Sequence, residues 1–478
     1  MNILNEAVYH FIRENKEIVS ADPYRLHYHL MPPVGLLNDP NGFVYYQGKY
    51  HIFFQWNPFE TKHGRKYWGH YCSDDLVHWE ALPIALAPDE WYDKDGCYSG
   101  SAVVKDGKLL LFYTGNVKNS GGKRETYQCL AISEDGITFE KKGPIIYLPE
   151  GYTAHFRDPK VFFKNGRWYM VIGAQTVNKQ GEVVLYTSSD IENWTFCGAL
   201  AGSSRNGLGD FGYMWECPDL FTLNSRDILI MSPQGLEADG YKYNNLFQSG
   251  YLSGKVDYEK TSYDHGEFQE LDRGFDFYAP QTTEDPQGRR LLFAWMGNAE
   301  PAESQQPTVK HKWIHALTLP RTLEFKDGKL FQQPVEELTR LRKNRVSYHH
   351  VNLENEKIQL ENILGNVVEM EVSLKKNENS TFSITFGKSK LSYDPDAALF
   401  SFQRMRFDKQ GMESRHCTLS ELRHLRIYKD SSSLEIFINH GEEVFTSRIF
   451  DEIGATEITF QANGLICFDV NKWDLGSK

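Results

Sequence analysis

The sequence lacks the cysteine pattern of a disulfide-stabilised or zinc-binding protein. It has seven cysteines, an odd number, and none of them forms a C-x-x-C pair. This usage favours reduced thiols in a cytosol over a disulfide scaffold or a metal site. An export signal is also missing, because the opening segment MNILNEAVYHFIRENKE instead carries apolar residues at the spacing of an amphipathic helix. We therefore expect a cytoplasmic protein whose residues 1–24 form an N-terminal helical segment.

Basic charge and long apolar runs are scarce as well. The formal net charge is −12, and an acidic chain without a basic block is a poor candidate for binding nucleic acid or an anionic membrane. No stretch approaches the roughly 18 consecutive apolar residues of a membrane-spanning helix. Aromatic residues are plentiful, at 14% of the 478 residues. A chain of this length predicts two domains, one of them large.

A unit of two apolar strands joined by a tight turn occurs five times. Its turn residues Gly48, Gly107, Gly166, Ser225 and Gly288 follow one another at intervals of 59, 59, 59 and 63 residues. A second marker, Ser-x-Asp ahead of an aromatic residue, follows three of the copies in SDDLVHW (73–79), SEDGITF (133–139) and SSDIENW (188–194). The five copies are NGFVYYQGKYHIFFQW (41–56), SGSAVVKDGKLLLFYTG (99–115), RDPKVFFKNGRWYMVIG (157–173), CPDLFTLNSRDILIMS (217–232) and APQTTEDPQGRRLLFAWMG (279–297).

This repeat predicts an all-β fold in which five sheets form a β-propeller over residues 25–322. A β-sandwich built from similar hairpins is the alternative, but the regular period favours the propeller. Equivalent points of all propeller blades face one central channel, so the polar tips before the inner strands should ring a single funnel. These tips supply Asn38, Asp39, Ser99, Asp158, Glu216, Asp219 and Gln281.

The pattern changes after the fifth copy. Residues 319–344 contain a last hairpin and a charged helical stretch, and we expect residues 323–344 to form a linker. Apolar and polar residues then alternate, for example in VEMEVSL (368–374), which is typical of half-buried antiparallel strands. Residues 345–478 are therefore predicted to form a C-terminal β-sandwich that serves stability or assembly. A homo-oligomer is compatible with this pattern but does not follow from it.

Several acidic side chains that face one funnel repel one another, so their clustering indicates a function. Two carboxyl groups about 5–5.5 Å apart can hydrolyse a glycoside with retention, one as nucleophile and one as acid/base. Glu216 fits the acid, since its neighbours in YMWECP predict an apolar setting that raises its pKa. Asp39 lies among turn amides that keep it ionised. The structural alternatives are a turn cap for Asp39, a buried ion pair for Glu216 and a pairing of Asp158 with Arg157.

Longer stretches around these carboxylates resemble family 32 of the glycoside hydrolases, the invertase and fructan hydrolase group. The resemblance extends over every blade, and LEIFINHGEEVFTSRIF (434–450) is similar to the C-terminal sandwich of the family. The matching stretches are NDPNG (38–42), FFQWNP (53–58), WGHYCSDDLVHW (68–79), YSGSAV (98–103), FRDPKV (156–161), MWECPDLF (214–221), DFYAPQ (276–281) and LPRTL (319–323).

The resemblance implies a role for each matching residue. Asp39 matches the nucleophile that attacks C2 of a fructofuranosyl unit, and Glu216 matches the acid/base. Asp158 matches the carboxylate that holds the ring hydroxyls and stabilises an oxocarbenium-like transition state. No metal or organic cofactor is implied. The sugar-binding residues that the resemblance and the motifs imply are Asn38, Gln55, Trp68, Tyr98, Ser99, Arg157 and Trp295.

Two features of the sequence bear on which substrate of the family this chain uses. The missing export signal favours sucrose that arrives in the cell already phosphorylated. In KHGRKYWGH (62–70), His63 takes the place of a family Trp, and basic residues stand beside it. We expect His63, Arg65 and Lys66 to attract a phosphate dianion. A solvated surface turn is the alternative.

Two other functions stay open at this point. A fructan exo-hydrolase or a fructosyltransferase on the same scaffold would differ only in whether water or a sugar intercepts the covalent intermediate. Product analysis at high sucrose separates hydrolysis from transfer, since oligofructosides indicate transfer. A non-catalytic sugar-binding propeller is the third hypothesis, and the intact carboxylates Asp39, Asp158 and Glu216 argue against it.

Overall fold

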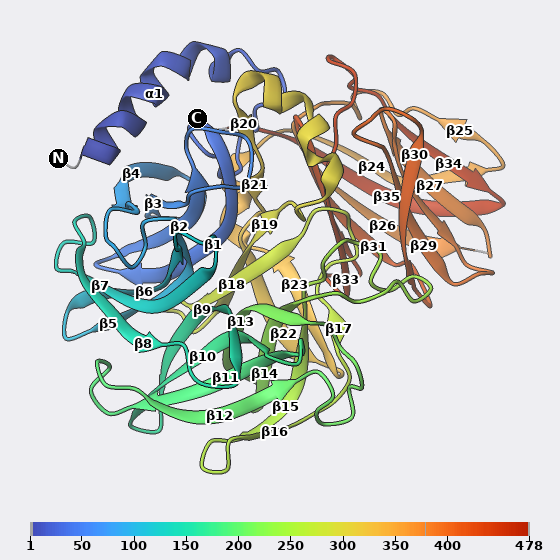
Figure 1. Cartoon of the computed structure of the whole chain (residues 1–478). Coiled ribbons are helices and arrows are strands. Elements are labelled where there is room, and N and C mark those ends of the chain that lie inside the picture. Colours follow the sequence, from blue (N-terminus) through green and yellow to red (C-terminus); the bar gives the residue numbers. More distant parts are fainter. Residues whose placement is uncertain (1–2, 378, 477–478) are drawn as a thin grey trace.

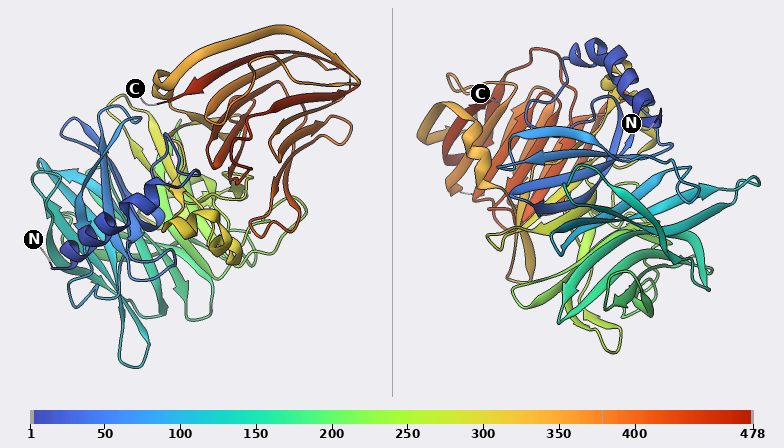
Figure 2. Two further views of the ribbon diagram at one scale, coloured as in Figure 1. Left: turned by 90° about the horizontal axis from the view of Figure 1, so that it is seen from above. Right: turned by 90° about the vertical axis from the view of Figure 1, so that its left-hand side faces the viewer.

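A computed structural model describes residues 3–377 and 379–476 as two β domains that lie side by side (Figures 1 and 2). The larger domain is a five-bladed propeller and the smaller one is a β-sandwich, so the predicted fold class is confirmed. Helix α1 (Ile3–Ser20) precedes both domains and packs Val8, which is fully buried, against the core of the first blade. In the described part of the chain, no helix has both the length and the apolarity needed to cross a membrane.

Four antiparallel strands make up each blade, and short extra strands join three of the sheets. The innermost strands β1, β5, β9, β13 and β18 contact one another in a closed ring around the central channel. The strands of blade one are β1 (Gly35–Tyr46), β2 (Lys49–Asn57), β3 (Tyr67–Ser73) and β4 (Trp79–Leu86), with β20 (Trp313–Ile314) parallel to β1. Those of blade two are β5 (Cys97–Lys105), β6 (Lys108–Lys118), β7 (Arg124–Ser133) and β8 (Glu140–Tyr147).

The remaining blades follow the same order from the channel outward. Blade three has β9 (Tyr152–Lys164), β10 (Arg167–Thr176), β11 (Gly181–Ser188) and β12 (Thr195–Gly202). Blade four has β13 (Met214–Leu223), β14 (Arg226–Gln234), β15 (Gly250–Asp257), β16 (Ser262–His265) and β17 (Gln269–Glu270). Blade five has β18 (Tyr278–Glu284), β19 (Arg290–Met296), β21 (Ala316–Leu317), β22 (Arg321–Lys326) and β23 (Lys329–Pro334).

The expected end of the propeller at residue 322 falls inside blade five. Strands β22 and β23 form a hairpin that pairs with β19, so this sheet continues to Pro334. The short helices η1 (Pro301–Gln305) and η2 (Pro307–His311) separate β19 from β22 along the chain, which hid their pairing in the sequence. We therefore place the domain boundary after Pro334, where the helix η3 (Glu336–Leu341) leads into the sandwich.

The turns of the repeat explain why its spacing is so regular. In the first four blades the inner hairpin closes with two residues of positive φ, as type I′ turns require. Gly48 has φ of 85°, and Ser225 takes the same left-handed conformation at 63°. The Ser-x-Asp marker recurs as one local structure, in which an aspartate accepts hydrogen bonds from the amides two and three residues later. These aspartates are Asp75, Asp135 and Asp190.

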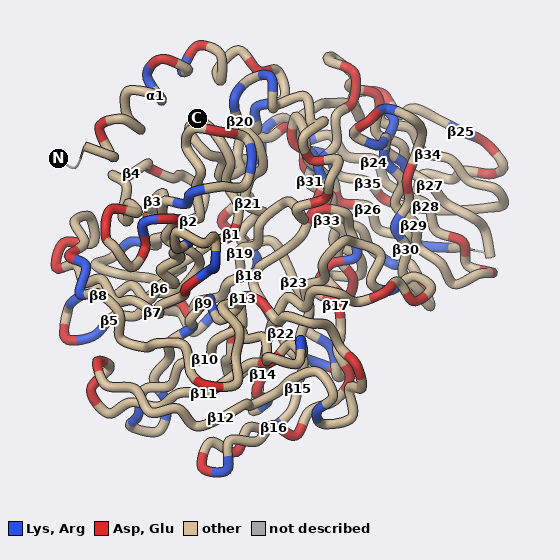
Figure 3. The backbone as a smooth tube through the Cα atoms, in the orientation of Figure 1, with Lys and Arg blue, Asp and Glu red and all other residues tan. Residues whose placement is uncertain are grey.

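The sandwich consists of two six-stranded sheets around a separate apolar core. In Figure 3, acidic and basic positions are intermingled along both domains. One sheet contains β24 (Arg342–Glu354), β35 (Leu465–Leu475), β26 (Val368–Asn377), β31 (His424–Asp430), β32 (Ser433–Ile438) and β33 (Glu443–Arg448). The other contains β25 (Lys357–Ile358), β34 (Ile458–Asn463), β27 (Thr381–Phe386), β28 (Ser389–Asp394), β29 (Leu399–Met405) and β30 (Met412–Thr418).

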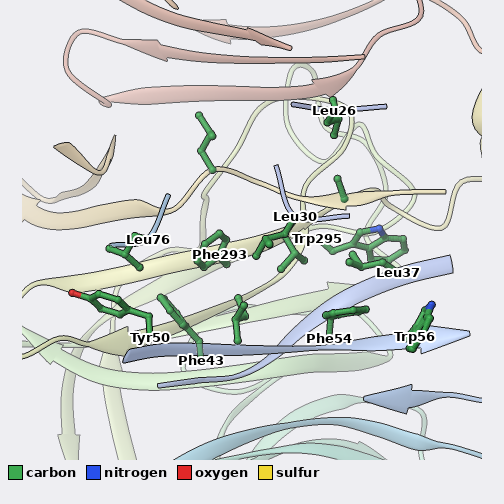
Figure 4. Packing of buried hydrophobic residues seen from close by; sticks show 14 of the residues in the cluster. Leu26, Leu30, Leu37, Phe43, Tyr50, Phe54, Trp56, Leu76, Phe293 and Trp295 are labelled. Carbon is green, nitrogen blue, oxygen red and sulfur yellow. The ribbon is translucent and has the colours of Figure 1, made fainter. Parts of the chain in front are cut away.

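Two kinds of contact hold the domains in a fixed relation. One apolar cluster, part of which Figure 4 shows, includes Leu30 of the N-terminal segment, Phe293 and Trp295 of blade five, and Tyr428, Phe437 and Val444 of the sandwich. At the domain interface, the fully buried Arg321 donates hydrogen bonds to Asp272 within the propeller and to Glu435 in the sandwich, at 3.1 and 2.7 Å. Replacing Arg321 or Glu435 alone would leave an unpaired buried charge, which costs about 3–5 kcal/mol.

Candidate active site

A β-bulge near the start of every inner strand builds the candidate site. Each inner strand has one more residue than its hairpin partner at this point, and such bulges re-aim side chains. The bulges lie at 38–39, 99, 158–159, 217–218 and 279–280. Four of them contain or directly precede a proline, which has no amide hydrogen to leave unpaired. These prolines are Pro40, Pro159, Pro218 and Pro280.

A cavity of about 480 Å³ lies among these bulges. Its walls include the carboxylates of Asp39, Asp158 and Glu216, which come from blades one, three and four. Most of the site residues predicted from the sequence are therefore brought together. The predicted residues that line the cavity are Asn38, Asp39, Gln55, His63, Arg65, Lys66, Tyr98, Arg157, Asp158, Glu216 and Trp295.

The surroundings of Glu216 are polar, which corrects the apolar setting expected from YMWECP. Arg157 donates two hydrogen bonds to its Oε1, at 2.9 and 2.6 Å. Gln234 and Tyr278 donate to Oε2, at 2.7 and 2.6 Å. Burial raises the pKa of Glu216, but the charge of Arg157 and these donated bonds outweigh burial and leave the pKa below its usual value. The residues next to Glu216 in the sequence do not reveal these polar surroundings, because Arg157 and Tyr278 belong to other blades.

Asp39 accepts a hydrogen bond at each carboxylate oxygen. Asn38 donates to Oδ1 at 3.1 Å, and Ser99 donates to Oδ2 at 2.6 Å. The thiol of Cys217 lies 3.7 Å from Oδ2. Burial and the nearby charge of Glu216 raise the pKa of Asp39, while the bonds from Ser99 and Asn38 lower it. The net direction is upward and the donors to the carboxylate are side chains, so the expectation that turn amides keep Asp39 ionised is wrong.

Asp158 is the most buried of the three carboxylates, with 5% of its surface exposed. It has φ of 68°, a strained conformation for a residue other than glycine. Its Oδ2 accepts a hydrogen bond of 2.9 Å from the backbone amide of Cys217 in blade four. Burial raises the pKa of Asp158, and the negative charges of Glu216 and Asp39 raise it further, against the lowering effect of Arg157. The ionisation of Asp158 therefore depends on the charges of Glu216 and Asp39.

Some expected funnel residues serve the scaffold instead. Trp68 is fully buried and donates from Nε1 to the carbonyl of Tyr98, so it supports a wall residue without lining the cavity. Ser99 acts through Asp39. Gln281 accepts from the amide of Phe43 and donates to the carbonyl of Gly100, which ties blade five to blades one and two. Asp219, buried to 1% exposure, accepts from the amide of Thr282.

The cavity also contains residues that sequence reasoning did not assign to it. The position of Tyr278 could have been predicted, since it begins the tip YAPQ of blade five. The positions of Lys118 and Arg124, from the β6–β7 hairpin, could not, because the sequence does not show which hairpin reaches over the channel. The additional lining residues are Gly64, Asp95, Lys118, Arg124, Gln234, Phe247, Tyr278 and Ala299.

A larger cavity, of about 1060 Å³, lies elsewhere and contains none of the three carboxylates. It is lined by α1 and by strands and loops of blades one and two. Among residues 3–377 and 379–476, no cluster of three or more His, Cys, Asp or Glu side chains has the arrangement of a metal site.

The carboxylates at the hub of the propeller, together with the polar cavity that they line, define a glycoside hydrolase. Comparison with known proteins identifies the family. Residues 29–334 match the N-terminal domain of glycosyl hydrolases family 32, and residues 337–474 match the C-terminal domain of that family. The chain therefore belongs to glycosyl hydrolase family 32, as the motifs indicated.

Relatives extend over nearly the whole chain. The sucrose-6-phosphate hydrolase of Bacillus subtilis is 52% identical over 474 residues, which cover 99% of this chain and 98% of that protein. The solved structure of sucrose-6-phosphate hydrolase from Lactobacillus gasseri superposes with a TM-score of 0.88 at 32% identity, covering 98% of this chain and 96% of that one. The GH32 β-fructofuranosidase of Bombyx mori gives a TM-score of 0.85 at 35% identity, covering 99% and 98%.

Proposed function

We propose that this protein is a retaining β-fructofuranosidase that hydrolyses sucrose 6-phosphate, and also sucrose, to fructose and glucose 6-phosphate or glucose. The observation that carries the proposal is that one cavity is lined both by carboxylates and by accessible cations. The carboxylates come from blades one, three and four, and the exposed or half-buried cations are Arg65, Lys118 and Arg124. The names of the full-length relatives support the same substrate.

In the first step, Asp39 attacks C2 of the fructosyl unit while Glu216 protonates the leaving glucosyl oxygen. The C2–O bond to glucose breaks as the C2–O bond to Asp39 forms, and the proton on Glu216 leaves with the sugar. In the second step Glu216 takes a proton from water, and the resulting hydroxide attacks C2 and releases Asp39. Each step inverts C2, so the product retains the configuration of the substrate.

Asp158 controls where the proton of the carboxyl group resides. In the unliganded site its pKa is raised and that of Glu216 is lowered, which is the wrong distribution for an acid at Glu216. Ring hydroxyls that donate to Asp158 would favour its ionised form. The proton would then be available to Glu216. Substrate binding would thus create the protonated acid that the first step requires.

A phosphate on the glucosyl unit would meet three cations. Arg65 and Lys118 are exposed and Arg124 is half-buried. Arg65 is held by a hydrogen bond of 2.5 Å from its guanidinium to the carbonyl of Pro88. Arg124 lies with its guanidinium carbon 5.8 Å from the centre of the Tyr98 ring. We call Arg65, Lys118 and Arg124 the basic wall. Asp95 also lines the cavity and accepts a hydrogen bond from the amide of Lys118.

Such a reaction belongs in the cytoplasm, where a sugar that is phosphorylated on import would be found and where the seven free cysteines stay reduced. The test is kcat/KM for sucrose 6-phosphate, sucrose and inulin with the same preparation. We expect kcat/KM to be highest for sucrose 6-phosphate, lower for sucrose and lowest for inulin. A preference for inulin over both small substrates would contradict the proposal, and oligofructosides formed at high sucrose would favour a fructosyltransferase.

A further inference from the structure

Lys66 occupies an unusual place for a residue expected to bind phosphate. Only 4% of its surface is exposed. Its ammonium donates a hydrogen bond of 2.8 Å to Oδ1 of Asn38 and lies 3.3 Å from Nδ1 of His63. Burial lowers the pKa of Lys66 to about 7, although the charges of Asp39 and Glu303 raise it. Burying an ammonium is costly, so a cation kept here needs a function at this position.

The ammonium fixes the orientation of the Asn38 amide. Lysine has three donors and no acceptor, so Asn38 must turn its oxygen toward Lys66. The amide nitrogen of Asn38 then points away from Lys66, and it donates to Oδ1 of Asp39 and to Oε1 of Gln55, each at 3.1 Å. Without Lys66, Asn38 could turn its oxygen toward Asp39 when that carboxyl is protonated, because a protonated carboxyl can donate a hydrogen bond.

The donor-to-acceptor direction of these hydrogen bonds continues through Gln55 and Ser99. Gln55 accepts from Asn38 with its oxygen, so its nitrogen is free to donate to Oγ of Ser99. Ser99 has a single hydroxyl hydrogen, and because its oxygen accepts from Gln55, this hydrogen goes to Oδ2 of Asp39 at 2.6 Å. Both oxygens of Asp39 thereby accept hydrogen bonds, and these bonds lower the pKa of Asp39 against burial and the charge of Glu216, which raise it.

We propose that Lys66 is a positioning residue that sets the direction of the hydrogen-bond chain Lys66–Asn38–Gln55–Ser99–Asp39 and thereby keeps Asp39 ionised for attack. The proposal rests on the role of Asp39 in the proposed function. It separates Lys66 from the basic wall, because its ammonium serves the fructosyl part of the cavity. Loss of Lys66 should therefore affect phosphorylated and plain sucrose equally.

The charged groups around this chain come from several elements. Asp39 faces Asp158 of β9 and both Glu216 and the Cys217 thiol of β13. Lys66 faces His63 and, at longer range, Asp39 and Glu303 of η1. His63 in turn has Nε2 at 3.5 Å from Glu303. Apart from Lys66, the groups that face Asp39 most closely are acidic, so removing the ammonium leaves Asp39 with acidic neighbours that raise its pKa.

The test is the pH dependence of kcat/KM for sucrose in Lys66→Met, Lys66→Arg and wild type. In Lys66→Met, Asn38 can present its oxygen to Asp39, which favours the protonated carboxyl. The acid limb of the profile should move upward by about one pH unit, with the same loss on sucrose 6-phosphate. Arginine is also donor-only, so Lys66→Arg should keep the wild-type limb. Lys62→Met, an exposed lysine on the same loop, is the matched control and should leave the profile unchanged.

A folded Lys66→Met enzyme whose acid limb stays at the wild-type pH would overturn the proposal. An acid limb that moves as far in Lys66→Arg as in Lys66→Met would overturn it too. If Lys66→Met does not fold, Asn38→Leu takes its place, because it removes the donor to Asp39 without adding a charge beside it. Its limb must move upward, and an unmoved limb rejects the proposal. An active Asp39→Ala enzyme would instead reject the proposed function itself.

Discussion

Arg157 of blade three grips Oε1 of Glu216 in blade four with two donated hydrogen bonds, although the two residues are 59 positions apart in the chain. The guanidinium stabilises the ionised form of Glu216, which in the proposed mechanism delivers a proton. Tyr278 adds to this effect at Oε2, at 2.6 Å. The acidity of Glu216 is therefore set by residues from two other blades, and single substitutions should tune it.

Replacing Tyr278 with Phe should raise the pKa of Glu216. A hydrogen bond to a charged group contributes about 1.5–3 kcal/mol, which corresponds to roughly one pKa unit or more. Because Glu216 must be protonated for the first step, the alkaline limb of kcat/KM should move upward by about one pH unit. Tyr251→Phe removes a buried hydroxyl that donates to Gln269, outside the residues that line the cavity, and serves as control. An alkaline limb that moves down in Tyr278→Phe would contradict this account.

Removing one cation of the basic wall should weaken discrimination for phosphate. For Arg65→Ala, Lys118→Ala and Arg124→Ala, we expect kcat/KM on sucrose 6-phosphate to fall about tenfold more than on sucrose, since charge-assisted hydrogen bonds contribute about 1.5–3 kcal/mol. The measurement is a paired comparison of both substrates for each variant. Equal losses on the two substrates reject a phosphate role for the residue that was changed.

His29 should make the stability of the domain interface depend on pH. It lies fully buried between Asp430 and Glu435, at 2.9 and 3.0 Å. Burial lowers its pKa, but the hydrogen bonds and charges of the two carboxylates outweigh burial and raise it to about 9. A raised pKa stabilises the folded state fully below the unfolded value near 6.5, and this contribution is lost as the pH rises through about 9.

Urea unfolding at pH 6 and pH 9.5 measures this effect. The wild type should lose stability between the two values, on the order of 2–3 kcal/mol from this group. His29→Gln should be less stable than the wild type at pH 6 and should show a smaller difference between the two pH values. A difference as large in His29→Gln as in the wild type would assign the pH dependence to other groups.

The fourth repeat carries a suboptimal turn that a single change should improve. Ser225 has φ of 63° where the other copies have glycine, and an L-residue pays roughly 1–2 kcal/mol in this conformation. Ser225→Gly should therefore raise the free energy of unfolding by about 0.5–1 kcal/mol after the entropy of the unfolded glycine is subtracted. Gly166→Ser, at the equivalent turn of blade three, should destabilise by a similar amount. Kinetic constants of both variants should match the wild type.

Periodicity made the propeller and its polar tips predictable. The hairpin turns recur at a fixed spacing because each blade repeats one local structure, and the prolines after the tips mark the bulges that turn side chains into the channel. The end of blade five was misplaced because η1 and η2 separate β19 from β22. The surroundings of Glu216 could not be read from its neighbours, because Arg157 and Tyr278 reach it from other blades.

The residues expected to bind phosphate show a similar limit. Arg65 and Lys66 are adjacent in the sequence and looked equivalent. The strand β3, which begins at Tyr67, is preceded by a backbone that turns Lys66 into the protein and leaves Arg65 exposed. Arg65 therefore belongs to the basic wall, whereas Lys66 donates a hydrogen bond to Asn38.

The most direct test of the central claim is to identify the residue that becomes covalently attached to the sugar. In Glu216→Ala the second step lacks its base, so the fructosyl-enzyme should accumulate when an activated fructoside is added. Peptide mass analysis after acid quenching should find one added fructosyl unit on the peptide that contains Asp39. An adduct on Asp158, or no adduct in an enzyme that still turns over, would contradict the account.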